Sequence, residues 1–131
     1  MTRGERVAAA ARALIGVPFR LHGRDPAIGL DCVGVVAAAL RGAGHIGPMP
    51  EGYAIRCGNA QGYADCWQGL APAGGGQAGD ILLCRVAAMH LHLAVRTQEG
   101  IIHADVGLGR VVARPGVPPW PIEAAWQLGE G

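Results

Sequence analysis

The hydrophobic period of this chain changes from helical to strand-like between its two halves. Residues 5–15 place small apolar side chains at helical spacing, and Gly16 and Pro18 end that pattern. From residue 80 onward, apolar and polar residues alternate in short runs that turn residues separate. Helices first and an antiparallel sheet later predict an α+β fold. A length of 131 residues suits one domain, so we expect residues 1–131 to form a single unit.

A second helix is predicted over residues 32–40. This run is almost wholly apolar, and it directly follows Asp31, a residue type that caps helix N-termini well. A buried strand is the alternative, because Val35 and Val36 are β-branched. The three consecutive alanines that follow and the capping Asp favour a buried helix.

Four short strands are predicted in the second half of the chain, over residues 80–86, 91–97, 100–104 and 109–114. Residues 117–121 contain three prolines, so they cannot form a central strand and are expected to cross the surface. Residues 42–79 match no pattern that we can assign, apart from a short helix expected around 60–67.

The charge balance excludes two classes of partner. Lys and Arg total 11 and Asp and Glu total 10, so the net charge of +1 attracts neither nucleic acid nor anionic lipid. No apolar run reaches the roughly 18 residues of a membrane-spanning helix. An apolar run near the N-terminus is interrupted by Arg12, and no small-x-small cleavage site follows it. We therefore expect a protein made in the cytoplasm, without a membrane partner and without an export signal of its own.

The four cysteines, at 32, 57, 66 and 84, form no Cys-x-x-Cys pair. A zinc ribbon or a thioredoxin-type site is therefore not indicated. Cys57 and Cys66 flank a loop-like stretch, and two interpretations stay open for them. They form a disulfide in an oxidising setting, or they remain free thiols in a protein of the cytosol.

Cys32 is the candidate nucleophile. At the start of a helix, unpaired N–H groups and the positive end of the helix dipole favour a thiolate over a thiol. Helix N-termini lower a cysteine pKa from about 8.5 to roughly 3.5–7.5. The same N–H groups can hold an oxyanion that forms on a substrate carbonyl. A cysteine in an apolar run is also an ordinary small core residue, so Cys32 needs a base nearby before a catalytic role follows.

Three histidines of the strand region are candidate bases. His90 and His92 are two residues apart and share one face of a strand. His103 lies 11 residues beyond His92 across a tight turn, which suits a hairpin that makes the two near neighbours. One imidazole could then take a thiol proton while the other orients it. A zinc site of His90, His92 and His103, with Cys84 nearby, is the alternative, and spacing alone does not separate the two.

Four segments, in order and over residues 6 to about 114, resemble the motifs of the NlpC/P60 cysteine peptidases. The first runs from an entry loop to the start of the second helix, and the other three fall on predicted strands. They read Gly16-Val17-Pro18-Phe19 with Gly29-Leu30-Asp31-Cys32-Val33-Gly34, then Gly79-Asp80-Ile81, then His92-Leu93-Ala94-Val95, and finally Ile102-His103-Ala104.

This resemblance implies a papain-like α+β core and a thioester mechanism without metal or organic cofactor. Cys32 would be the nucleophile, His92 the general base and His103 the orienting polar residue. The substrate and oxyanion region would include Phe19, Asp31, Val33 and His90. Family members cleave amide bonds in peptidoglycan stem peptides, commonly between D-γ-glutamyl and a diamino acid.

The stretch before Cys32 is similar, more narrowly, to peptidases of phage and gene-transfer-agent tails. That similarity implies tail or baseplate proteins as partners and action at the cell wall as part of a particle. Three alternatives remain at this point. Phe19 stands where the family usually has Tyr, so the chain could be a structural tail-tip component without useful activity. It could be the zinc-dependent hydrolase described above, or it could transfer the acyl group to an acceptor other than water.

Overall fold

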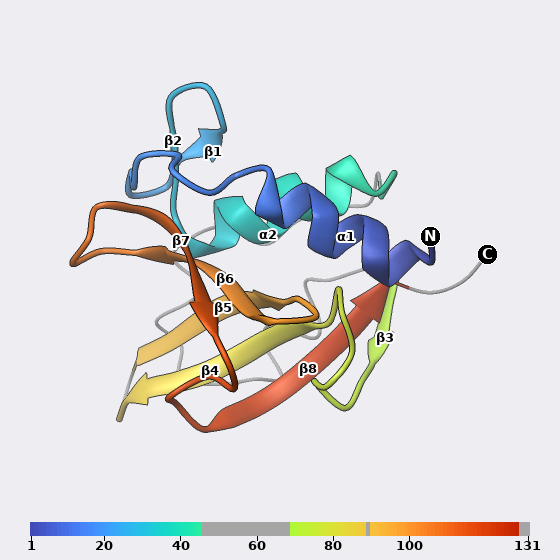
Figure 1. The fold of residues 1–131 in the computed structure, drawn as a ribbon. Coiled ribbons are helices and arrows are strands. Elements are labelled where there is room, and N and C mark those ends of the chain that lie inside the picture. Colours follow the sequence, from blue (N-terminus) through green and yellow to red (C-terminus); the bar gives the residue numbers. More distant parts are fainter. Residues whose placement is uncertain (46–68, 89, 129–131) are drawn as a thin grey trace.

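Two helices lie on one face of a six-stranded antiparallel sheet (Figure 1). The structure is a computed structural model, and it describes residues 1–45, 69–88 and 90–128. The observed layers confirm the predicted α+β fold. The strand order in the sheet is β3-β8-β4-β5-β6-β7, and β1 and β2 form a separate small hairpin. The elements are α1 (Arg3–Arg12), β1 (Arg24–Asp25), β2 (Gly29–Leu30), α2 (Cys32–Gly42), β3 (Leu70–Pro72), β4 (Ile81–Ala87), β5 (His90–Arg96), β6 (Gly100–Asp105), β7 (Arg110–Pro115) and β8 (Ile122–Leu128).

The two helices predicted within the described residues are present, and their caps explain where they begin. The α2 helix starts at Cys32 because the Asp31 side chain accepts a hydrogen bond from the backbone N–H of Gly34, as an N-cap should. The α1 helix starts at Arg3, two residues earlier than predicted. Thr2 and Glu5 form a reciprocal capping box there, and this motif sets the start.

The four predicted strands correspond to β4, β5, β6 and β7, each within one residue at both ends. Two further strands of the sheet were missed, and so were the two-residue strands β1 and β2 outside it. The β3 strand is three residues long, contains Pro72 and lies at the sheet edge, so its pattern is too short to detect. The β8 strand lies inside the sheet between β3 and β4, but Ala124 and Ala125 at its centre are weak strand formers.

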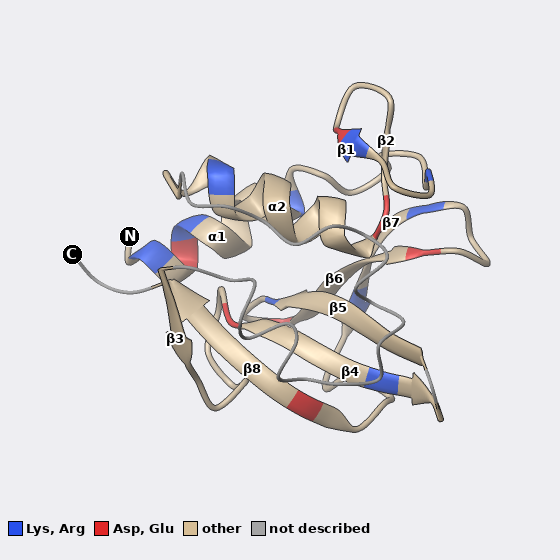
Figure 2. Ribbon diagram, turned by 180° about the vertical axis from the view of Figure 1, so that it is seen from behind, with Lys and Arg blue, Asp and Glu red and all other residues tan. Residues whose placement is uncertain are grey.

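Residues 117–121 lie outside the strands, as predicted from their prolines. The helix expected around 60–67 and the pair Cys57 and Cys66 lie outside the described residues. Within the described part, no helix is both long and apolar enough to span a bilayer. Charged residues are spread over helices, hairpins and strands instead of gathering on one element (Figure 2).

Two apolar clusters cover the two faces of the sheet. The main core lies between the sheet and the helices, and a smaller second cluster lies on the other face. Alternation along β5 separates them, because Leu91, Leu93 and Val95 belong to the main core and Ala94 to the second cluster. The second cluster contains Leu82, Cys84, Ala94, Ile101 and Ala125, with Ala73 and Trp120 packed against it.

The β4 strand begins at a close contact with α1. Gly79 has a φ of 91°, and a Cβ at this position would lie 2.1 Å from the carbonyl oxygen of Gly4. Only glycine therefore fits both the dihedral angle and the space. The buried carboxylate of Asp80 accepts hydrogen bonds from the N–H groups of Gly75 and Gln77 and so fixes the loop before the strand. The Gly79-Asp80 pair of the sequence motif thus fixes the start of β4 against α1 and the preceding loop.

Candidate active site

Cys32 occupies the first position of α2, where the helix meets the sheet. Its side chain is 6% exposed and belongs to the main core. Backbone N–H groups of Leu93 and Val33 form hydrogen bonds to its sulfur. The ladder between β5 and β6 pairs Val95 with Ile102 and does not continue to Leu93 in the described strands. The sulfur therefore lies where these two strands separate, against the peptide bond that follows His92.

The thiol of Cys32 is held in its neutral form. Burial raises its pKa to about 12, and the nearby Asp31 carboxylate acts in the same direction. Hydrogen bonds from Leu93 and Val33 and the charge of Arg24 oppose this rise, but burial dominates. The expectation of a lowered pKa at the helix N-terminus is therefore wrong for this structure. The N-terminal N–H groups are present as expected, but desolvation of the thiolate outweighs them.

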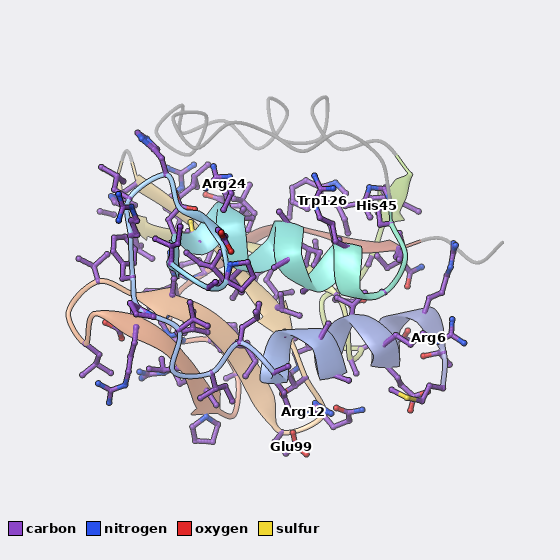
Figure 3. All side chains as sticks on the ribbon, turned by 90° about the horizontal axis from the view of Figure 1, so that it is seen from above. Arg6, Arg12, Arg24, His45, Glu99 and Trp126 are labelled. Atoms are coloured by element: carbon purple, nitrogen blue, oxygen red, sulfur yellow. The ribbon has the colours of Figure 1, made fainter. Side chains whose placement is uncertain are left out.

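Asp31 joins the entry loop to the first turn of α2. Its buried carboxylate accepts hydrogen bonds from the N–H of Gly34 at 2.8 Å and from the N–H of His22 at 2.9 Å. The guanidinium of Arg24 forms a salt bridge to it at 2.7 Å and lies beside this end of α2 in Figure 3. Three donors on one carboxylate hold the loop against Cys32. Asp31 is therefore a capping and clamping residue in this structure.

Gly34 allows the entry loop to approach α2 closely. A Cβ at this position would lie 2.2 Å from the carbonyl oxygen of Gly23, well inside contact distance. The Asp-Cys-x-Gly spacing thus has a physical reason. Asp31 attracts the loop, and the glycine three residues later leaves the space that the loop occupies.

His92 and His103 form the imidazole pair of the site. The Nε2 atom of His92 lies 3.0 Å from Nδ1 of His103, so the hairpin brings the two rings together as the spacing suggested. Alternation places both rings on the sheet face of the second cluster, together with Cys84, which is paired with His92 across β4 and β5. Trp120 lies edge-to-face against both imidazoles. Because Nε2 of His92 faces His103, the other ring nitrogen of His92, Nδ1, takes no part in this contact.

Both imidazoles are neutral near pH 7. Burial lowers the pKa of His92 to about 4; His103 and His90 add to this effect, and Asp105 opposes it. Burial also lowers the pKa of His103, where Asp105 opposes and Arg114 reinforces the shift. A neutral histidine is the form that can accept a proton, although a pKa of about 4 makes His92 a weak base.

The other predicted site residues have different positions. Val33 is fully buried, and its backbone N–H is the part that faces the sulfur. Phe19 is partly buried and packs against the main core. His90 is exposed at the start of β5. In the part of the chain that the structure describes, no group of three or more His, Cys, Asp or Glu side chains could hold a metal ion.

Two residues of the site escaped the sequence analysis. Arg24 lies in a loop rich in charge, and nothing in its spacing singled it out from the other arginines. Trp120 lies in a run of prolines that indicated only an irregular segment. A large aromatic residue between prolines is the signal that could have drawn attention to it, because such a segment holds its side chain rigidly.

The site thus combines a cysteine at a helix N-terminus with an antiparallel sheet that carries paired histidines. No family model and no curated protein matches the sequence. Solved structures do match. NlpC1 from Trichomonas vaginalis is 20% identical with a TM-score of 0.71, over 95% of this chain and 44% of that one. The chain thus spans less than half the length of that protein.

Two isolated domains match over most of both chains. The P60 domain of an antigen from M. avium subspecies paratuberculosis is 20% identical, with a TM-score of 0.63, over 98% of this chain and 96% of that one. The NlpC/p60 domain of the peptidoglycan hydrolase SagA is 24% identical, with a TM-score of 0.59, over 86% and 88%. The chain therefore has the NlpC/P60 fold.

Proposed function

We propose that this chain is a cysteine peptidase that hydrolyses amide bonds of peptidoglycan stem peptides. One observation carries the proposal. The Cys32 sulfur at the N-terminus of α2 lies against the backbone N–H of Leu93, directly after His92, and His92 is hydrogen-bonded to His103. The nucleophile is thus next to the backbone of the strand that carries the proposed base, and acyl transfer further requires the His92 ring to come within proton-transfer distance of the sulfur. The fold shared with the NlpC/p60 domain of SagA, described as a peptidoglycan hydrolase, supports the substrate class.

The proton route follows from the neutral resting state. In this proposal His92 carries its hydrogen on Nε2 and donates it to Nδ1 of His103, which leaves Nδ1 of His92 to accept the thiol proton. The Cys32 sulfur then bonds to the substrate carbonyl carbon as that proton moves to His92. The C–N bond breaks, and His92 returns the proton to the leaving amine. Water next attacks the thioester, His92 takes the proton of the water, and the carboxylic acid leaves as the thiol re-forms.

The first turn of α2 supplies donors for the oxyanion. The Gly34 N–H is committed to Asp31, and the Val33 N–H contacts the resting sulfur. We therefore assign the Cys32 N–H as the first oxyanion donor, joined by that of Val33 once the sulfur has bonded to the substrate. A helix N-terminus favours the negative oxygen that forms during attack. The role that we assign to Asp31 is to hold this turn and the entry loop in place.

The finer assignments belong to the same proposal. The scissile bond is D-γ-glutamyl to a diamino acid, and the chain acts at the cell wall as a component of a phage or gene-transfer-agent tail. The family resemblance over residues 6 to about 114 supports the first assignment, and the narrower resemblance of the stretch before Cys32 supports the second. Tail or baseplate proteins are then the protein partners.

The test uses purified sacculi and defined muropeptides with mass spectrometry of the products. We expect Cys32→Ala to abolish release of stem-peptide fragments, while Cys84→Ala, which removes the other described thiol, retains it. A chelator should leave the rate unchanged. Hydrolysis that survives Cys32→Ala would refute the nucleophile. Products in which an amine instead of water has added to the cleaved carbonyl would identify acyl transfer. A wild-type protein without hydrolytic activity would indicate a structural tail component instead of a peptidase.

A further inference from the structure

Trp120 contacts both imidazoles from the sheet face that α1 and α2 do not cover. Its ring centroid lies 5.4 Å from that of His92 and 5.4 Å from that of His103, with an interplanar angle of 79° in both contacts. The two imidazoles are 5.1 Å apart and nearly perpendicular. Three rings in mutual edge-to-face contact form a closed triangle, in which each ring restricts the rotation of the other two.

The backbone holds Trp120 rigidly in this place. Prolines at 118, 119 and 121 fix the φ angles on both sides of it. The carbonyl oxygen of Pro121 accepts a hydrogen bond from the N–H of Arg85 at 2.9 Å, and β8 begins at the next residue. The indole also packs against the second cluster. The segment from 117 to 121 is therefore a fixed support, which places the indole next to the imidazole pair.

Several ionisable groups surround the pair, and their effects oppose one another. On β5 and β6, His90 disfavours a proton on His92, and Asp105 favours one. On β7, Arg114 disfavours a proton on His103, while the same Asp105 favours one. On β4, Cys84 is a buried thiol whose pKa burial raises to about 11, so it adds no charge. The exclusion of water is then the effect that keeps both rings neutral.

We propose that Trp120 is a positioning residue for the proposed peptidase. Its indole holds the rings of His92 and His103 in their mutual orientation and excludes water from the side of the pair that the helices leave open. The catalytic consequence rests on the proposed function, because the orientation of His92 matters only if this ring receives the proton of Cys32. The physical role of the indole can be tested without any substrate.

The first test follows the proton signals of His92 and His103 by NMR from about pH 3 to about pH 8. In Trp120→Ala, we expect the pKa of His92 to rise by at least about one pH unit toward 6.5, because water regains access to the ring. Trp120→Phe should shift it less, since a phenyl ring still covers the pair. Trp126→Phe is the matched control, because Trp126 is buried in the main core and its replacement should leave both titrations unchanged. The acid limb of kcat/KM should move with the pKa of His92.

A second measurement applies if Trp120→Ala does not fold. An imidazolium next to an indole quenches its fluorescence, so the emission difference between wild type and Trp120→Phe should fall as the pH drops through about 4. An unchanged pKa of His92 in Trp120→Ala, an equal shift in Trp126→Phe, or a pH-independent emission difference would overturn the proposal. Failure of the Cys32→Ala experiment would refute the peptidase and leave these titrations valid, so the two proposals fail separately.

Discussion

Burial of His92 makes the stability of the protein depend on pH in a predictable direction. The pKa of His92 is about 4 in the folded chain, against an ordinary value of 6.5. Below pH 6.5 the unfolded chain therefore binds a proton at His92 that the folded chain does not, and stability falls as the pH falls. The full shift corresponds to about 3 kcal/mol, of which about 2 kcal/mol is lost between pH 7 and pH 5. Below about pH 4 the folded state also binds the proton, and this loss stops growing.

Urea unfolding of wild type and His92→Gln at the two pH values measures this effect. The glutamine variant cannot bind the proton, so its free energy of unfolding should fall by about 2 kcal/mol less over the same interval. The pKa of His103 and of His45 is also lowered by burial, so a smaller loss in the same direction should remain in the variant. Equal losses in both proteins would show that His92 does not set the slope and would refute the reasoning.

Three further predictions concern the first turn of α2. Asp31→Ala should lower the free energy of unfolding, measured with urea, by about 2–3 kcal/mol, because three donors lose a charged acceptor. A loss below about 0.5 kcal/mol would contradict the role of Asp31 in holding the entry loop against α2. Gly34→Ala should lower the free energy of unfolding by about 1–3 kcal/mol, because the new Cβ collides with the backbone of Gly23. Gly74→Ala is the control, since a Cβ there meets open space, and it should lower the free energy of unfolding far less in the same assay. Equal losses in the two variants would exclude the collision. The rate at which iodoacetamide alkylates Cys32 should rise about tenfold per pH unit between about pH 7 and pH 10, because the small thiolate fraction rises by that factor when the pKa lies above this range. Peptide mass mapping measures the rate. A rate independent of pH would disprove the raised pKa.

The parts of the site that depend on local patterns were predictable from the sequence. A capping Asp before an apolar run identifies the start of α2, and this places Cys32 at a helix N-terminus. Alternation and a tight turn identify β5 and β6, and this brings His92 close to His103. These features depend on residues near one another in the chain, so their physical causes are visible in short windows.

The features that the sequence did not reveal depend on long-range packing. The pKa of Cys32 follows from how completely the sheet and α2 bury the sulfur, and no local pattern reports that burial. The contact of Trp120 with the imidazole pair depends on where the segment after β7 crosses the sheet. The β8 strand was missed because its two central alanines carry little strand preference, and its pairing partners supply the stabilisation instead.

The position of β8 has a consequence for how the chain is made. This strand is the last of the described strands in chain order, but it lies inside the sheet and joins β3 to β4. During synthesis, the two helices and the middle hairpins can leave the ribosome before the sheet can close, because β8 emerges after all the other described strands. A nascent chain that stalls before residue 122 would leave β4 with an open edge and β3 without a neighbour. Shortened forms of this protein are thus expected to aggregate instead of folding into a smaller version of it.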